Sequence, residues 1–103
     1  MREEWTVHAA GQRDLIAKYI FDSFGERRAM KFRQEVDEAV DMLLRYPTSG
    51  VLDPLFSDRP VAYRSVIVGG RSKMVYRIDE ECIHIVGFWD CRQDPEDQAS
   101  WVE

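Results

Sequence analysis

The stretch Val61–Trp89, VAYRSVIVGGRSKMVYRIDEECIHIVGFW, contains the clearest indication of the fold. It contains three segments rich in β-branched and aromatic residues, at 61–69, 72–78 and 82–89, a composition typical of strands. Gly69-Gly70 separates the first two segments, and Asp79-Glu80-Glu81 separates the last two. Links this short join neighbouring antiparallel strands. The stretch therefore predicts a three-stranded antiparallel meander.

Two amphipathic helices are predicted upstream of the meander. From residue 13 to 24, apolar side chains recur at helical spacing, and Gly25 follows, where a helix commonly ends. We expect the aromatic residues of this helix to be core: Tyr19, Phe21 and Phe24. A second helix is predicted for residues 26–46, with Pro47 as its stop. The short turn between them predicts an antiparallel helical hairpin.

The remaining segments complete an α+β fold. Glu3–Ala10 alternates loosely between apolar and polar residues and predicts a short opening strand. Residues 47–60 are rich in proline and predict a loop that is held to the core by its apolar side chains. The order is β-α-α-β-β-β, with the hairpin against one face of the sheet. We expect residues 1–103 to form a single domain.

Composition excludes several classes of protein. The net charge is −5, which disfavours a protein that grips nucleic acid over its whole surface. No apolar run approaches the roughly 20 residues that span a bilayer, and the N-terminal residues lack a secretory apolar region, so a cytoplasmic protein is expected. Cys82 and Cys91 are expected to be reduced. No Cys/His pair has a familiar zinc-binding spacing, so neither a metal site nor a cofactor is predicted.

Strand alternation gathers cations on one face of the meander. Lys73, Val75 and Arg77 share a face, while the neighbouring residues 74, 76 and 78 form the core face. Arg64 is expected near Arg77 or Lys73 across the first turn. These cations have no obvious acidic partner, and such a set on an open face suits a polyanion. From spacing alone we favour the alternative in which they keep an exposed sheet face soluble. His84, expected on the side of Phe88, is interpreted as a packed or paired side chain.

Three segments together resemble the RelE/ParE superfamily of bacterial type II toxin–antitoxin toxins. They are DLIAKYIFDSFG with the helical pattern after it, YRSVIVGGRSKMVYRI, and IHIVGFWDCRQDP. The resemblance covers about Trp5 to Pro95 and implies the same fold as the one derived above. It also implies a cognate antitoxin as partner, in a hetero-oligomer, and a role in plasmid stabilization.

The resemblance suggests residue roles for RNA cleavage. Lys73 matches the position at which RelE-like toxins carry a phosphate-contacting arginine, and Arg92 matches an arginine after the last strand. Lys73 and Arg92 are therefore candidate catalytic residues. The candidates for proton transfer are Asp90, His84 and Tyr76, of which the last two are expected to be buried, so Asp90 is the third candidate catalytic residue. Arg64, Arg71 and Arg77 are the candidate RNA-binding residues. RelE-like nucleases commonly carry a tyrosine or histidine shortly after that last arginine, whereas this chain has the run Gln93–Asp97.

Three functions follow from the resemblance and stay open at this point. The first is a growth-inhibiting, ribosome-dependent mRNA endonuclease toxin, which the basic strand residues favour and which is the function we expect. The second is a non-catalytic, ParE-like inhibitor of DNA gyrase. The third is a non-toxic relative that only binds its antitoxin. The low positive charge favours the second and third.

Overall fold

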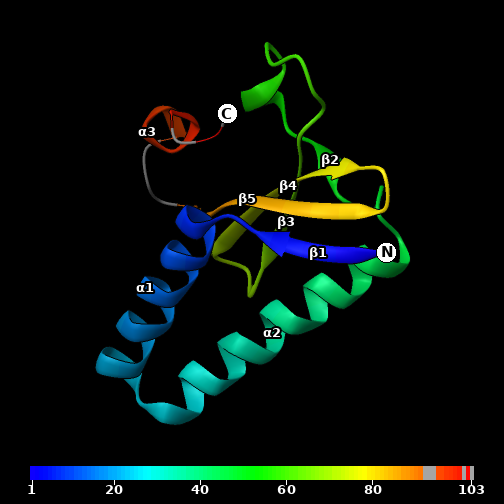
Figure 1. Ribbon diagram of the computed structural model, residues 1–103. Helices are drawn as coiled ribbons and strands as arrows, with labels where there is room; N and C mark the ends of the chain where they lie inside the picture. Colours follow the sequence, from blue (N-terminus) through cyan, green and yellow to red (C-terminus); the bar gives the residue numbers. More distant parts are fainter. Residues whose placement is uncertain (92–94, 101, 103) are drawn as a thin grey trace.

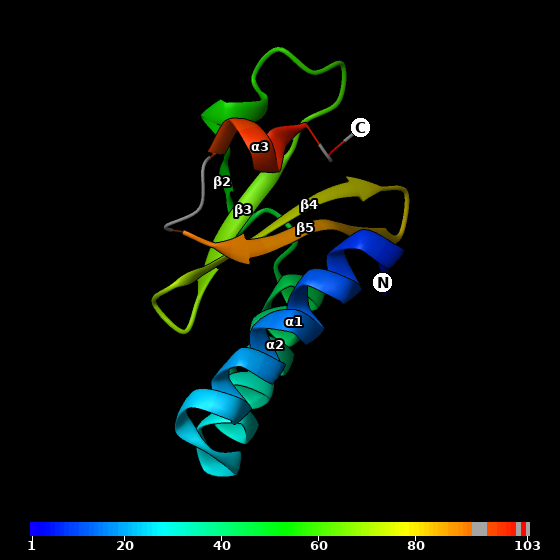
Figure 2. The same ribbon diagram turned by 90° about the vertical axis from the view of Figure 1, so that its left-hand side faces the viewer.

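The computed structural model describes residues 1–91, 95–100 and 102. A five-stranded sheet with the order β1-β5-β4-β3-β2 forms its centre, and a helical hairpin covers one face of the sheet (Figure 1). This confirms the predicted α+β class and the helical hairpin. Figure 2 shows the hairpin on one side of the sheet and the short helix α3 on the other. None of the helices in the described part of the chain combines the length and the apolar character needed to cross a bilayer.

The meander is confirmed as three long antiparallel strands. They are β3 (Arg64–Val68), β4 (Ser72–Asp79) and β5 (Cys82–Asp90). Two further strands extend it. β2 (Val51–Leu52) pairs antiparallel with β3, inside the segment expected to be a loop. β1 (Arg2–Trp5) pairs with β5 in parallel, because the hairpin carries the chain back across the sheet before β3 begins.

The expected opening strand 3–10 is too long at its C-terminal end. β1 ends at Trp5, and α1 (Val7–Phe24) begins directly afterwards. Thr6 caps this helix, because its hydroxyl accepts a hydrogen bond from the amide of Ala9 at 3.0 Å. α2 (Glu26–Arg45) follows after Gly25 and ends close to the predicted position.

The main core lies between the hairpin and the sheet. Phe32, Val36 and Leu43 of α2 contact Met74, Tyr76, Ile83, Ile85 and Phe88 of the central strands. The aromatics Tyr19, Phe21 and Phe24 of α1 were expected in this core but are more than half exposed. The hairpin extends past the end of the sheet, so its tip lies beyond the main core (Figure 2). Ala9 and Ala17 are the buried residues of α1 instead.

A bulge changes the direction of side chains along β5. Val75 of β4 pairs with Gly87, whereas Tyr76 pairs with Ile85, so Val86 is the extra residue. Consequently Phe88 joins the core under the hairpin and Trp89 faces the other side. The expectation that His84 and Phe88 share a face is therefore wrong. Gly87 is required at this point because a Cβ there would collide with the ring of Trp89.

A second, smaller core covers the sheet face away from the hairpin. It consists of Phe56, Tyr63, Val75, Trp89 and Val102, all buried. The 3-10 helix η1 (Pro54–Phe56) and α3 (Pro95–Ala99) lie over it. The guanidinium of Arg59 donates to the carbonyls of Ala99, at 2.8 Å, and Val102. This face is therefore closed over its central part, where an open cationic face was expected.

Candidate functional site

Lys73, a predicted catalytic residue, is held by an ion pair with a buried carboxylate. Its ammonium Nζ lies 2.5 Å from Oδ2 of Asp53, a carboxylate whose side chain is 3% exposed. The Lys73 side chain is itself only 20% exposed and lies beside the Trp89 ring, 5.8 Å from the ring centroid. The other carboxylate oxygen of Asp53 accepts a hydrogen bond from the amide of Leu55 at 3.0 Å and caps η1. Asp53 therefore holds both the cation and the loop that covers this face.

Arg64 and Arg77 lie together at the opposite end of β4. They line one shallow pocket with Thr48 and Asp79. The Arg64 guanidinium donates to the carbonyls of Gly50 at 2.8 Å and Thr48 at 3.3 Å. Arg77 lies 3.7 Å from the carboxylate of Asp79. The expected proximity of Arg64 to Arg77 is confirmed, but the expectation that these cations lack acidic partners is wrong for Lys73 and Arg77.

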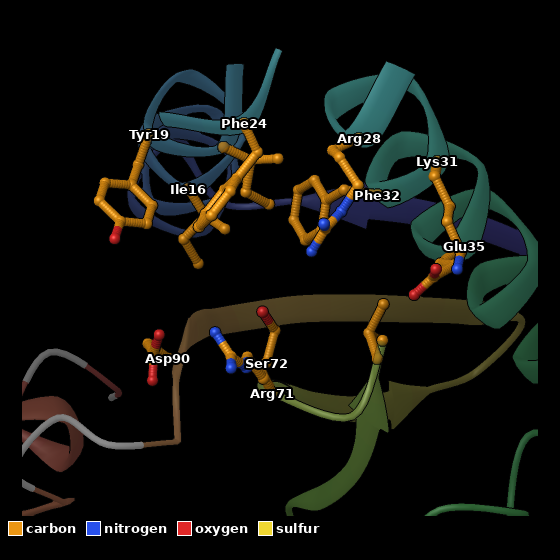
Figure 3. Close-up of a pocket in the computed structure, with 13 residues that line it drawn as sticks. Ile16, Tyr19, Phe24, Arg28, Lys31, Phe32, Glu35, Arg71, Ser72 and Asp90 are labelled. Atoms are coloured by element: carbon orange, nitrogen blue, oxygen red, sulfur yellow. The ribbon is translucent and has the colours of Figure 1, made fainter. Parts of the chain in front are cut away.

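Arg71 and Asp90 lie at a third place, beside the tip of the hairpin. A cavity of about 250 Å³ separates the end of the sheet from the two helices. Arg71, Ser72 and Asp90 line one side, with side chains of α1 and α2 opposite them (Figure 3). The backbone also closes this end of the sheet, since the Cys91 amide donates to the Arg71 carbonyl at 2.8 Å.

The hairpin side of this cavity is aromatic and charged. Tyr19 and Phe24 of α1 face it, and their rings contact edge to face with centroids 6.3 Å apart (Figure 3). The Arg28 guanidinium lies over the Phe24 ring, 5.0 Å from its centroid. Lys31, Phe32 and Glu35 complete the α2 side. Apolar rings beside charges of both signs suit a protein segment better than a uniform polyanion.

Two side chains that could transfer a proton, Tyr76 and His84, lie away from Lys73. Tyr76 is buried under the hairpin, where its hydroxyl donates to the Pro47 carbonyl at 2.6 Å and accepts from the Gly50 amide at 3.0 Å. Burial raises the pKa of this hydroxyl, an effect partly offset by the Gly50 amide and by Arg64. His84 lies on the face away from the hairpin, paired in register with Arg77, whereas Lys73 is paired with Trp89.

The predicted site residues thus occupy separate places. Arg64 and Arg77 share one pocket, Arg71 and Asp90 share another, and Lys73 is bound to Asp53. Arg92 lies outside the described residues. Sequence reasoning missed Asp53, although an Asp-Pro pair in the loop is a common helix start and was a usable signal.

Comparison with known proteins identifies the family. A sequence model described as "ParE toxin of type II toxin-antitoxin system, parDE" matches residues 4–95. The chain belongs to the ParE toxin family. This confirms the predicted membership of the RelE/ParE superfamily and implies an antitoxin partner for this ParE-family chain.

A solved structure supports the fold of this ParE-family chain. A chain from the "Chromosomal ParDE TA system from P. aeruginosa" superposes with a TM-score of 0.70 at 24% sequence identity. The alignment covers 87% of this chain and 95% of that chain. Comparison with curated protein sequences gave no match.

Proposed function

We propose that this ParE-family toxin acts by binding a protein target, DNA gyrase, and not by cutting RNA. The observation that carries the proposal is the ion pair between Lys73 and the buried carboxylate of Asp53. ParE-like inhibition of gyrase, as the family resemblance implies it, needs no catalytic side chain. The proposal places this action in the cytoplasm, where the chromosome and gyrase are found.

The surroundings of Lys73 do not suit RNA cleavage. Attack of a 2′-hydroxyl on a phosphate needs a cation at the phosphate and groups that move protons. If Lys73 turned to a phosphate, the Asp53 carboxylate would be left buried without its cation, which is strongly unfavourable. The buried position of Tyr76 and the distant register of His84 leave Lys73 without either of them as a proton-transfer partner.

The net charge of the protein also argues against RNA cleavage. The protein carries a net charge of −5, and RNA binding depends on summed positive charge. Arg64 uses its guanidinium to hold the 48–50 backbone. In the endonuclease alternative, Lys73, Asp90 and Arg92 remain the candidate catalytic residues, and the Lys73 pair would have to open.

The lining of the cavity at the hairpin tip supports a proposal for where the antitoxin docks. The cavity has apolar walls from Ile16, Ile20 and Phe32, and exposed rings at its rim. We propose that an antitoxin segment inserts an apolar side chain here and pairs an acidic group with Arg28 or Arg71. Burial of Phe24 and Tyr19 would then supply much of the affinity.

Pulse-labelling of cells that express the toxin without its antitoxin tests the proposed mechanism. Thymidine incorporation should fall before methionine incorporation, because a gyrase block stops replication first. An early fall of methionine incorporation with fragmented mRNA would instead support the endonuclease. Normal incorporation of both labels, with the protein folded and present, would support the non-toxic alternative.

A further inference from the structure

Three potential metal ligands converge on the sheet face away from the hairpin. Glu4 of β1, Cys82 and His84 of β5 each offer one ligand atom, and these atoms all lie within 4.8 Å of one another. Cys82 and His84 are two residues apart on one strand, before the bulge, so their side chains share a face. Glu4 is the register partner of His84 on the parallel strand β1. The sheet pairing itself therefore assembles the cluster.

The distance between Glu4 and His84 matches that of a tetrahedral site, and the Cys82 sulfur lies within 4.8 Å of both ligand atoms. Zinc binds sulfur at about 2.3 Å and nitrogen or oxygen at about 2.0–2.2 Å, which places neighbouring ligand atoms about 3.4–3.6 Å apart. Nδ1 of His84 already lies 3.5 Å from Oε2 of Glu4. The Cys82 sulfur makes only a weak contact, 3.7 Å long, to the Ile83 carbonyl. Small side-chain rotations would bring all three atoms onto one ion.

We propose that Glu4, Cys82 and His84 form a zinc site that joins the edge strand β1 to β5. Thiolate, imidazole and carboxylate groups each bind zinc, and the two negative charges of this set neutralise the ion. Binding forms one sulfur–zinc bond and releases the Cys82 thiol proton to solvent. Three protein ligands leave a fourth position for water or a partner side chain.

Asp79 completes the arrangement as a positioning residue. Its Oδ2 lies 3.8 Å from Nε2 of His84, the ring nitrogen that faces away from Glu4. A carboxylate that accepts a hydrogen bond from the free nitrogen of a zinc-bound histidine fixes the ring and strengthens the ligand. Glu4 thus lies beside Nδ1 and Asp79 beside Nε2 of the same imidazole, so we assign Nδ1 to the ion and Nε2 to Asp79.

The competing interpretation is an ion-pair network without metal. Arg2 lies 3.5 Å from Glu4, and Arg77 lies 3.7 Å from Asp79, so cations already flank both carboxylates. That network explains the carboxylates and His84 and leaves Cys82 with packing alone. The thiol is 3% exposed and lies within 4.8 Å of a Glu4 and a His84 ligand atom, so without metal Cys82 serves only as a small packing residue. The two interpretations therefore differ at Cys82.

Cobalt substitution in the full, untagged chain tests the site. Titration with Co²⁺ should give tetrahedral visible bands and a thiolate-to-cobalt charge-transfer band, and Zn²⁺ should abolish both at one equivalent. Cys82→Ser should remove the charge-transfer band, whereas Cys91→Ser, the matched control at the exposed cysteine, should keep it. Asp79→Asn should weaken zinc binding by about 10-fold with the band retained.

A second variant tests the site without changing the buried Cys82. Glu4→Gln changes a half-exposed side chain and should lower zinc affinity while the circular dichroism spectrum stays native. Zinc should also slow amide exchange in β1 of the native chain, and less so in this variant. The proposal is overturned if the native chain gives no charge-transfer band. It is equally overturned if the band survives Cys82→Ser and disappears with Cys91→Ser.

Discussion

The ammonium of Lys73 lies 2.5 Å from the carboxylate of Asp53, and the same carboxylate caps the 3-10 helix that covers this side of the sheet. One buried acid thus binds the only described lysine of the meander and orders the loop above it. The pair links a residue expected to contact RNA to the stability of the fold. Two variants can separate these roles.

Asp53→Asn should lower the free energy of unfolding by about 3 kcal/mol, because it leaves the Lys73 ammonium largely buried without a counter-charge. Asparagine keeps an oxygen that can cap η1, so the loss reports the ion pair and not the cap. Urea denaturation monitored by tryptophan fluorescence measures the change.

Lys73→Met and the double variant complete the comparison. The double variant should be more stable than the sum of the single losses predicts, because neither partner is then left alone. A coupling energy near zero would mean that Lys73 is not held by Asp53 in solution, and its ammonium would be available to a phosphate.

Phe24→Ala should weaken antitoxin binding by about 10-fold or more, since truncating an aromatic side chain that becomes buried in an interface costs upwards of about 1.4 kcal/mol. Phe21→Ala is the matched control: it lies on the same helix at 53% exposure, against 51% for Phe24, but does not line the cavity. Calorimetric titration of each toxin variant with its antitoxin measures the difference. Equal losses for both variants would place the antitoxin elsewhere on the hairpin.

Tyr76→Phe should destabilise the protein by about 1–3 kcal/mol at neutral pH, because the buried Gly50 amide loses its hydrogen-bond acceptor. The native tyrosine has a raised pKa, so its contribution is complete below the ordinary tyrosine pKa of about 10 and is lost as pH rises through the folded-state value. The stability difference between the two proteins should therefore shrink above about pH 10. Urea denaturation from pH 7 to 11 follows it, and a constant difference would contradict the raised pKa.

Local sequence patterns predicted most of the fold. The meander, the hairpin and the core face of β4, with Met74 and Tyr76, follow from short-range periodicity. The pairing of β1 with β5 does not, because parallel partners distant in sequence leave no local signal. The bulge at Val86 is similarly hidden, and it shifts Phe88 and every later side chain of β5 to the other face.

The candidate site was less predictable than the fold. Strand alternation correctly placed Lys73 and Arg77 on one face, but it could not show that η1 and α3 close that face. Asp53 lies in an irregular loop, where side-chain direction has no period to follow. Glu4 likewise meets Cys82 and His84 only through the parallel pairing, which is why spacing along the chain predicted no metal site.

The most direct test of the proposed mechanism uses purified components. The toxin should inhibit DNA supercoiling by gyrase in a dose-dependent way, its antitoxin should reverse the effect, and ribosome-bound mRNA should remain intact at the same concentrations. Cleavage of ribosome-bound mRNA with supercoiling unaffected would contradict the account and would show that the Lys73–Asp53 pair opens to serve catalysis.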